Sequence, residues 1–253
     1  ALGACAFVFL VVACFSGVPF TKLLKSVKGV LFLLIFMALL NLFLYQGKTV
    51  WWEWKFIKIT KEATYYTIFL AEIASTVNEV LLLKYLYKQS QDKNLKKYLL
   101  NYYMDTIRAT LFRQTQFAEF EQKAHEKVEN GEALTKDSLC QMYYGLNKQY
   151  YGDGVVHDEK IAYEWARIPH FYNAFYVYKY ATGIISAISI VKRILTEGES
   201  AVNDYFEFLS AGGSADPVSI LKKAGVDLTS ETPFKVAMQE FADTLNEFKS
   251  LLD

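Results

Sequence analysis

The chain has 253 residues, enough for one or two domains, and its 27 Lys and Arg residues balance its 27 Asp and Glu residues. The resulting net charge of zero excludes both the broad basic field of a nucleic-acid-binding protein and an acidic field that attracts cationic partners. The three cysteines are too few and too scattered for a disulfide framework, and Cys140 is typical of a thiol in a reducing compartment.

Residues 1–45 are mostly apolar and form two runs. Ala1–Phe15 has no charged residue, and Val27–Tyr45 has only Lys28. The second run is long enough to cross a bilayer as a helix, and the lysine-rich loop between the runs would face the cytoplasm. We expect membrane helices here, with buried core helices of a soluble protein as the alternative.

Beyond residue 64 the apolar residues recur with a helical period, so we expect an all-α fold made of two domains, residues 1–63 and 64–253. Strand signals are almost absent, and only Val50–Thr60 is expected to be extended. Spacing, capping residues and breakers predict helices over Thr67–Gln89, Asn94–Asn130, Thr135 to about Tyr150, Asp158–Trp165, Phe171–Glu197, Asp216–Gly225 and Thr232 to about Leu252.

The first of these helices carries a polar stripe. Its members fall at i, i+3, i+4 and i+7 and therefore share one face: Glu72, Ser75, Thr76 and Glu79. A carboxylate in so apolar a helix costs free energy unless it meets a partner or a metal. The alternative is a solvent-exposed stripe on an amphipathic helix.

A second candidate site follows Pro169. Tyr172, Tyr176 and Tyr180 lie at i, i+4 and i+8 and would share one helix face beside His170. Phenol and imidazole groups could donate hydrogen bonds to a substrate carbonyl that becomes an oxyanion. Spacing alone favours the alternative, aromatic core packing with the hydroxyls turned outward.

Several ordered motifs occur in the helical part of the chain: Ala71–Glu79 (AEIASTVNE), Arg108–Glu121 (RATLFRQTQFAEFE), Arg167–Asn173 (RIPHFYN), Tyr180–Gly183 (YATG) and Phe206–Pro217 (FEFLSAGGSADP). Together they resemble the thimet oligopeptidase and oligoendopeptidase F family of zinc metallopeptidases. The resemblance covers the chain from about Tyr66 to Asp253 and matches the C-terminal part of such an enzyme. It implies a mostly helical, zincin-type lobe around a deep peptide-binding channel.

The resemblance also implies a zinc site, because the family holds zinc with two histidines of an H-E-x-x-H helix and a later glutamate. Glu72 matches the later glutamate. The histidine helix is expected near residues 44–52, which read LYQGKTVWW. His125–Glu129 reads H-E-x-x-E, lies downstream and is expected on a solvated helix face. A catalytic zinc typically takes three protein ligands, so zinc is expected in the parent family but not in this chain.

Family members use a histidine and tyrosines in the Arg167–Gly183 region to bind substrate and stabilise the transition state. This implies a catalytic role for His170, with Tyr176 as the first candidate among the tyrosines and Tyr172, Tyr178 and Tyr180 as the others. Arg108 and Arg113 are shared motif positions, which we expect to be structural ion-pair partners.

Residues 1–63 contain four further segments to compare with known families: Gly17–Lys25, Leu31–Phe36, Asn41–Leu44 and Ile57–Glu62. They resemble a fragment of the transmembrane T component of energy-coupling factor vitamin transporters.

Three functions follow as hypotheses. The first is a fragment of an oligopeptide-cleaving zinc peptidase, cytoplasmic and inactive without its histidine helix. The second is a chimeric membrane protein derived from the T component and held in the membrane through residues 1–45. The third is a pseudoenzyme that binds peptides without cleaving them. Nucleic acid is not expected as a partner of any of the three.

Overall fold

The computed structural model describes the backbone of residues 50–54, 57–212 and 214–252, and the side chains from Leu70 onward. The membrane helices expected in residues 1–45 lie outside these ranges. Within the described ranges, no helix combines the length and the apolar character needed to cross a membrane. The described chain forms two compact units, one with residues 50–71 and 209–215 and one with residues 72–208 and 216–252.

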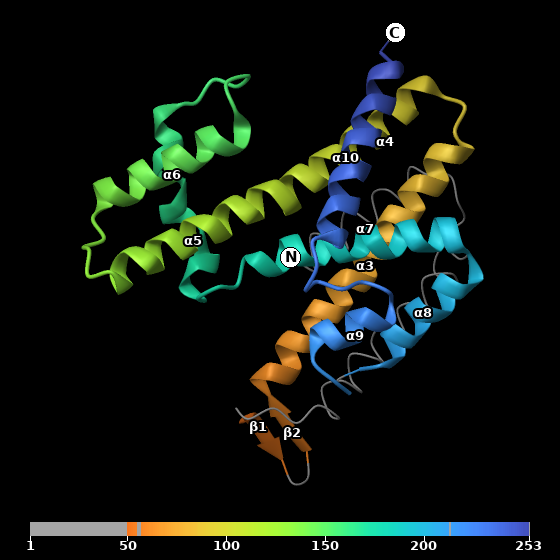
Figure 1. Cartoon of the computed structure of the whole chain (residues 1–253), viewed down its shortest axis with the longest axis horizontal. Coiled ribbons are helices and arrows are strands. Elements are labelled where there is room, and N and C mark those ends of the chain that lie inside the picture. The colour runs from red at the N-terminus through yellow and green to blue at the C-terminus, as the bar shows by residue number, and fades with distance from the viewer. Residues whose placement is uncertain (1–49, 55–56, 213, 253) are drawn as a thin grey trace. The chain divides into compact units, whose positions relative to one another are not determined.

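The smaller unit contains a β-hairpin. Strands β1 (Val50–Trp54) and β2 (Ile57–Thr60) are antiparallel, with Trp54 opposite Ile57 and an irregularity in the register between Val50 and Trp52 (Figure 1). The expected extended piece is therefore two paired strands. Helix α3 (Lys61–Gln89) starts directly after β2, six residues before the expected start at Thr67, and ends at the expected Gln89.

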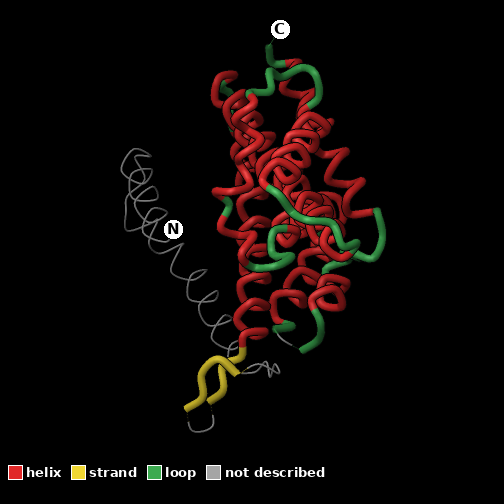
Figure 2. Tube along the Cα trace, turned by 90° about the vertical axis from the view of Figure 1, so that its left-hand side faces the viewer, coloured by secondary structure: helices red, strands yellow, loops and turns green. Residues whose placement is uncertain are grey.

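The larger unit is built of helices joined by loops, which confirms the expected helical class (Figure 2). Helix α4 (Lys93–Ile107), a π-helical turn (Arg108–Phe112) and α5 (Arg113–Glu129) follow one another without a break. Together they form the long helix expected between Asn94 and Asn130. A carboxylate oxygen of Asp92 caps its start by accepting a hydrogen bond of 2.8 Å from the Asn94 amide.

Helix α6 (Lys136–Tyr151) begins after Thr135, the residue expected to cap it, and the structure shows a capping box there. Thr135 Oγ1 accepts from the Ser138 amide at 3.2 Å, and Ser138 Oγ accepts from the Thr135 amide at 3.0 Å. The helix ends at Gly152, whose φ of +64° is in the left-handed region that glycine adopts easily.

The segment after α6 differs from expectation. The predicted helix over Asp158–Trp165 is a 3-10 helix (Glu159–Arg167), followed by a short 3-10 turn (Pro169–Tyr172). The helix predicted over Phe171–Glu197 begins only at Tyr178, as α7 (Tyr178–Glu197). The reason is Phe175, whose φ of +54° interrupts any right-handed helix.

The last two helices begin near their predicted start signals, whereas the helix before them lies in a segment where no helix was predicted. Helix α8 (Glu199–Ser210) follows Gly198, and α9 (Pro217–Lys223) is capped by Asp216, which accepts from the Ser219 amide at 3.0 Å. Helix α10 (Thr232–Ser250) has Pro233 in its first turn.

Helix α7 is the centre of the larger unit. Every residue from Gly183 to Val191 is buried, and α7 packs against α10, α5 and the π-helical turn (Figure 1). A helix that is apolar on all sides is stable only when other elements surround it. Helix α7 therefore gives the residues at its two ends rigid positions.

A second core lies between α5, α6 and the segment that leads to α7. Its buried members are Phe117, Phe120, Tyr143, Leu146, Ile168 and Val177. Aromatic rings dominate it, and Phe120 makes an edge contact with Tyr143 at a centroid distance of 5.3 Å. This core holds the irregular segment 159–177 against α5.

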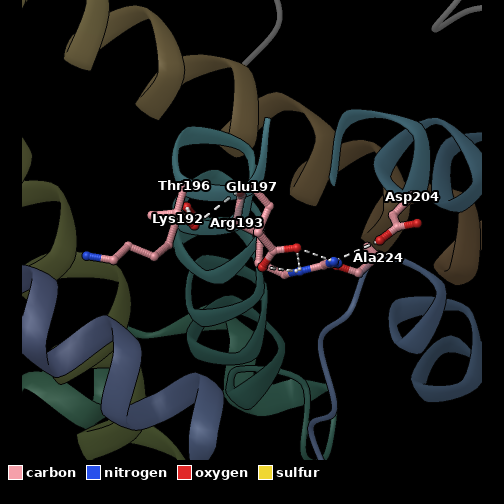
Figure 3. A network of polar contacts seen from close by, with 6 residues as sticks. All are labelled: Lys192, Arg193, Thr196, Glu197, Asp204 and Ala224. Atoms are coloured by element: carbon pink, nitrogen blue, oxygen red, sulfur yellow. Dashed lines mark hydrogen bonds and ion pairs between the residues drawn. The ribbon is translucent and has the colours of Figure 1, made fainter. Parts of the chain in front are cut away.

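Near its carboxyl end, α7 is tied to its neighbours by Arg193 (Figure 3). The guanidinium donates to Asp204 of α8 at 2.8 Å, to the Ala224 carbonyl after α9 at 2.7 Å, and to Glu197 at 2.7 Å. One side chain thus joins α7, α8 and the end of α9.

Candidate functional site

His170, Tyr176 and Tyr180 form a compact cluster at the amino-terminal end of α7. The Tyr180 hydroxyl lies 3.3 Å from His170 Nε2. The His170 and Tyr176 rings are stacked with centroids 5.9 Å apart, and the Tyr180 ring meets each of them edge-on at 5.7 Å. His170 is exposed, whereas the two phenols are half-buried, so the cluster has a solvent-facing side and a packed side.

Glu72 of α3 lies close enough to this cluster for its charge to act on Tyr180. Burial raises the pKa of the Tyr180 hydroxyl, and the neighbouring Tyr176 phenol and the Glu72 carboxylate raise it further. Burial also raises the pKa of Glu72 itself. The Tyr180 phenol therefore keeps its proton at neutral pH and remains a hydrogen-bond donor.

Helices α3 and α7 approach each other at this point. A methyl group on Gly183 would lie 4.0 Å from Ile73 Cγ1, one residue beyond Glu72. The predicted polar stripe of α3 is real but mixed in character: Ser75 and Glu79 are exposed, whereas Glu72 and Thr76 are half-buried. Glu79 accepts a hydrogen bond of 2.7 Å from the Tyr102 hydroxyl.

Two of the predicted site tyrosines do not join the cluster. Tyr172 lies in the 3-10 turn with 90% of its side chain exposed, and Tyr178 is 47% exposed at the first position of α7. The expected shared face of Tyr172, Tyr176 and Tyr180 is wrong, because the chain is not helical between residues 173 and 177. Tyr176 and Tyr180 meet His170 through the turn at Phe175 instead.

The residues present do not fit a catalytic zinc. Glu72 is the one residue of the chain that the family resemblance implies as a zinc ligand, and within the described ranges no three His, Cys, Asp or Glu side chains come together to hold a metal ion. Both ring nitrogens of His157 have partners, Asn147 Oδ1 at 2.9 Å and the Gly152 carbonyl at 2.8 Å. His125 is exposed on α5, as expected, with its ring against Phe175.

The two motif arginines make the ion pairs expected of them. Arg108 donates to Asp105 at 2.7 Å on the surface. Arg113 and Arg167 both pair with the buried Glu164, which also accepts a hydrogen bond of 2.6 Å from the Tyr143 hydroxyl. Glu164 is a structural residue that periodicity did not single out, although a carboxylate between Tyr163 and Trp165 was a usable signal.

Glu121 is the other residue that sequence reasoning missed. It is 5% exposed, and its Oε1 accepts a hydrogen bond of 2.6 Å from the Phe175 amide. This bond holds the turn with positive φ that brings Tyr176 to His170. A buried acid next to Phe120 in an aromatic stretch was again the available signal.

Comparison with known proteins gives a consistent result over these elements. The sequence profile of Peptidase family M3 matches residues 58–240. The chain is 50% identical over 187 residues to Oligopeptidase PepF of Bacillus subtilis (strain 168), covering 74% of this chain and 28% of that protein. It is 45% identical over 188 residues to the plasmid-encoded Oligoendopeptidase F of Lactococcus lactis subsp. cremoris, covering 74% of this chain and 31% of the relative.

A solved structure shares both the fold and the sequence. The crystal structure of oligoendopeptidase-F from Enterococcus faecium superposes with a TM-score of 0.72 at 46% identity, over 75% of this chain and 36% of that one. The chain thus spans about a third or less of the length of these relatives. None of these matches is to a transporter component, so the resemblance expected of residues 1–63 gains no support.

Proposed function

The chain belongs to peptidase family M3, and from this premise we propose that it is the C-terminal part of an oligopeptide-hydrolysing peptidase, inactive as a 253-residue chain. The family is zinc-dependent, and the relatives' names make oligopeptides the expected substrates. Glu72 is the residue that we assign to the metal in a complete enzyme.

The observation that carries the proposal is the His170–Tyr176–Tyr180 cluster beside Glu72. Tyr180 holds its proton because of burial and of its acidic neighbours. Protonated phenols and an imidazole N–H are donors suited to a peptide carbonyl, whose oxygen becomes more negative when water attacks it. We assign His170 and Tyr176 to substrate binding, with Tyr180 positioning the imidazole through the contact at 3.3 Å.

The proposed inactivity follows from the number of side chains that could bind zinc. The chain contains three histidines, and none of them stands in an H-E-x-x-H sequence. One carboxylate does not provide the three protein ligands that hold a catalytic zinc and activate its water.

The test uses the purified 253-residue chain, in mild detergent, with added zinc and a quenched fluorescent peptide. We expect no turnover above a matched sample that contains EDTA. The Bacillus subtilis relative is the positive control for the peptide. Robust turnover that a chelator abolishes would refute the proposed inactivity.

A second candidate function is peptide binding without cleavage, favoured by the cluster of hydrogen-bonding groups that His170, Tyr176 and Tyr180 form. Calorimetry with an uncharged hexapeptide should detect binding that His170→Ala weakens about tenfold, the value of one or two hydrogen bonds. Tyr85→Phe is the matched control, because this tyrosine is exposed on α3 and lies outside the cluster. Equal affinities of the unmodified chain and His170→Ala would rule out this function.

A further inference from the structure

A cavity of about 230 Å³ lies between α5 and the irregular segment that precedes α7. It does not include the residues of the His170–Tyr176–Tyr180 cluster. Pockets for whole small molecules measure about 300–1,000 Å³, so this one is of a size for a single side chain. It is lined by Phe120, Glu121, His125, Trp165, Ala166, Ile168, Phe171 and Tyr172.

Glu121 is the one acidic residue in this lining, and half of its carboxylate has no partner. Oε1 accepts from the Phe175 amide, but Oε2 is buried without a hydrogen bond. An unsatisfied buried carboxylate oxygen is costly, and most buried polar groups in folded proteins are paired. Because Glu121 lines the cavity, a group bound there is a candidate partner for this oxygen.

Aromatic rings make up most of the rest of the lining, and His125, Trp165 and Tyr172 add further polar groups to it. Trp165 Nε1 is also buried and has no acceptor. Phe120 and Phe171 pack with their ring centroids 5.5 Å apart, and Phe120 and Trp165 with theirs 6.3 Å apart. A ligand matched to this lining carries a positive charge for Glu121, a flat surface for the rings and an acceptor for the indole N–H.

We propose that this pocket binds the arginine side chain of a peptide. A guanidinium is planar, stacks on aromatic rings and donates to carboxylates, and it is less strongly hydrated than an ammonium group. The carbonyl groups of the same peptide residue provide an acceptor for Trp165. If the pocket is a subsite for a peptide substrate, the proposal rests on the proposed function. The binding of an arginine side chain by itself does not.

Other ligands fit the lining less well. An anion would meet the Glu121 carboxylate, which repels it. A divalent cation such as Ca²⁺ takes six to eight oxygen ligands, and the lining has a single carboxylate. A neutral apolar group would leave Glu121 Oε2 and Trp165 Nε1 without partners.

The pocket is linked mechanically to the cluster. Glu121 holds the amide of Phe175, and the Phe175 ring packs on His125 with a centroid distance of 4.6 Å. Tyr176 is the next residue along the chain. An occupied pocket would therefore support the turn that brings Tyr176 to His170.

The experiment uses the full chain and two single-residue probes, N-acetyl-arginine N-methylamide and its citrulline counterpart. Citrulline has nearly the same shape as arginine but is neutral. Ligand-observed NMR titration should give an affinity for the arginine probe that is about tenfold higher, as a charge-assisted hydrogen bond predicts.

Three variants test whether Glu121 causes the preference for the arginine probe. Glu121→Gln keeps an oxygen for the Phe175 amide but removes the charge, and it should abolish the preference for arginine. Glu129→Gln changes the same charge at an exposed site on the same helix and should preserve the preference. His170→Ala should preserve it as well, because the cluster does not line the pocket.

Equal binding of the two probes, or no binding of either, overturns the proposal. So does a preference for arginine that survives Glu121→Gln. If Glu121→Gln does not fold, as judged by its helical circular dichroism, the two probes on the unmodified chain decide the question. Failure here leaves peptide binding at His170 intact, and loss of hexapeptide binding leaves this pocket intact.

Discussion

At the scale of single residues, two buried carboxylates in this protein have opposite surroundings. Glu164 is held by Arg113, Arg167 and the Tyr143 hydroxyl. Burial by itself would raise the pKa of Glu164, but the Tyr143 hydroxyl and the Arg113 guanidinium outweigh burial and hold that pKa below its ordinary value. Glu121, by contrast, keeps one oxygen unpaired. That difference makes Glu164 a structural residue and Glu121 a candidate for binding a ligand.

The Glu164 network makes a prediction about stability. Glu164→Gln should lower the free energy of unfolding at pH 7 by about 2 kcal/mol, the value of hydrogen bonds to a charged group. Urea unfolding measures the change. Glu159→Gln, at an exposed position of the same 3-10 helix, is the control and should change the free energy little.

The same network predicts a dependence on pH. Because the folded-state pKa of Glu164 lies below its unfolded value, the stabilisation is complete above the unfolded pKa and is lost as the pH falls through the folded pKa. The unmodified chain should therefore lose stability more steeply than Glu164→Gln below about pH 4.5. Parallel curves for the two chains would contradict the assignment.

At the scale of elements, the break before α7 decides the geometry of the candidate site. A continuous helix from Phe171 would have placed Tyr172, Tyr176 and Tyr180 in one row. The positive φ of Phe175 ends that row and folds His170 back onto Tyr176 and Tyr180. The Glu121 carboxylate stabilises the break by accepting the Phe175 amide.

Near the opposite end of α7, the effect of a methyl group on Gly225 can be compared with its effect on Gly131, which lies after α5. Gly225 and Gly131 both have positive φ, +75° and +79°. A methyl group on Gly225 would lie 2.0 Å from Arg193 Nη1, whereas one on Gly131 has open space. Figure 3 shows that Arg193 is held by Glu197, Asp204 and Ala224, so it cannot move aside without losing hydrogen bonds.

We therefore expect Gly131→Ala to cost about 1 kcal/mol, the strain of a left-handed alanine, and Gly225→Ala to cost at least about 1 kcal/mol more, for the hydrogen bonds lost. Thermal or urea unfolding provides both values. With Arg193→Ala as the background the two substitutions should cost the same, since the clash is gone. A difference that persists in this background would show that Arg193 is not its cause.

At the scale of the whole molecule, the donor cluster and Glu72, the proposed metal ligand of a complete enzyme, come from different elements. Glu72 is on α3, Tyr180 is on α7, and His170 lies in the segment before α7. The packing of α7 against α10, α5 and the π-helical turn holds the position of Tyr180. The prediction that the chain does not hydrolyse peptides belongs to this scale, because it concerns ligands that the 253 residues do not contain.

The membrane residence expected for residues 1–45 also belongs to this scale. It falls on residues outside the described ranges, and it remains a prediction from the apolar runs alone. The domain boundary expected at residue 63 remains a prediction as well.

The sequence by itself determined the helical class, most helix ends and the family. Thr135, Asp216 and Gly225 act locally, through hydrogen bonds and dihedral angles within a few residues. Their effect can therefore be predicted from the amino-acid sequence alone. The family motifs also predict roles for Glu72 and His170 without any knowledge of contacts, and those roles stay predictions.

Only the tertiary structure decided which tyrosines join His170, and which buried acid keeps a free oxygen. Both outcomes depend on side chains about 50 residues apart, as in the bonds from Glu121 to Phe175 and from Arg113 to Glu164. Helical periodicity describes one helix at a time and contains no information about such partners. Burial of a polar group is a property of everything packed around it, and so it became visible only once the helices were in place.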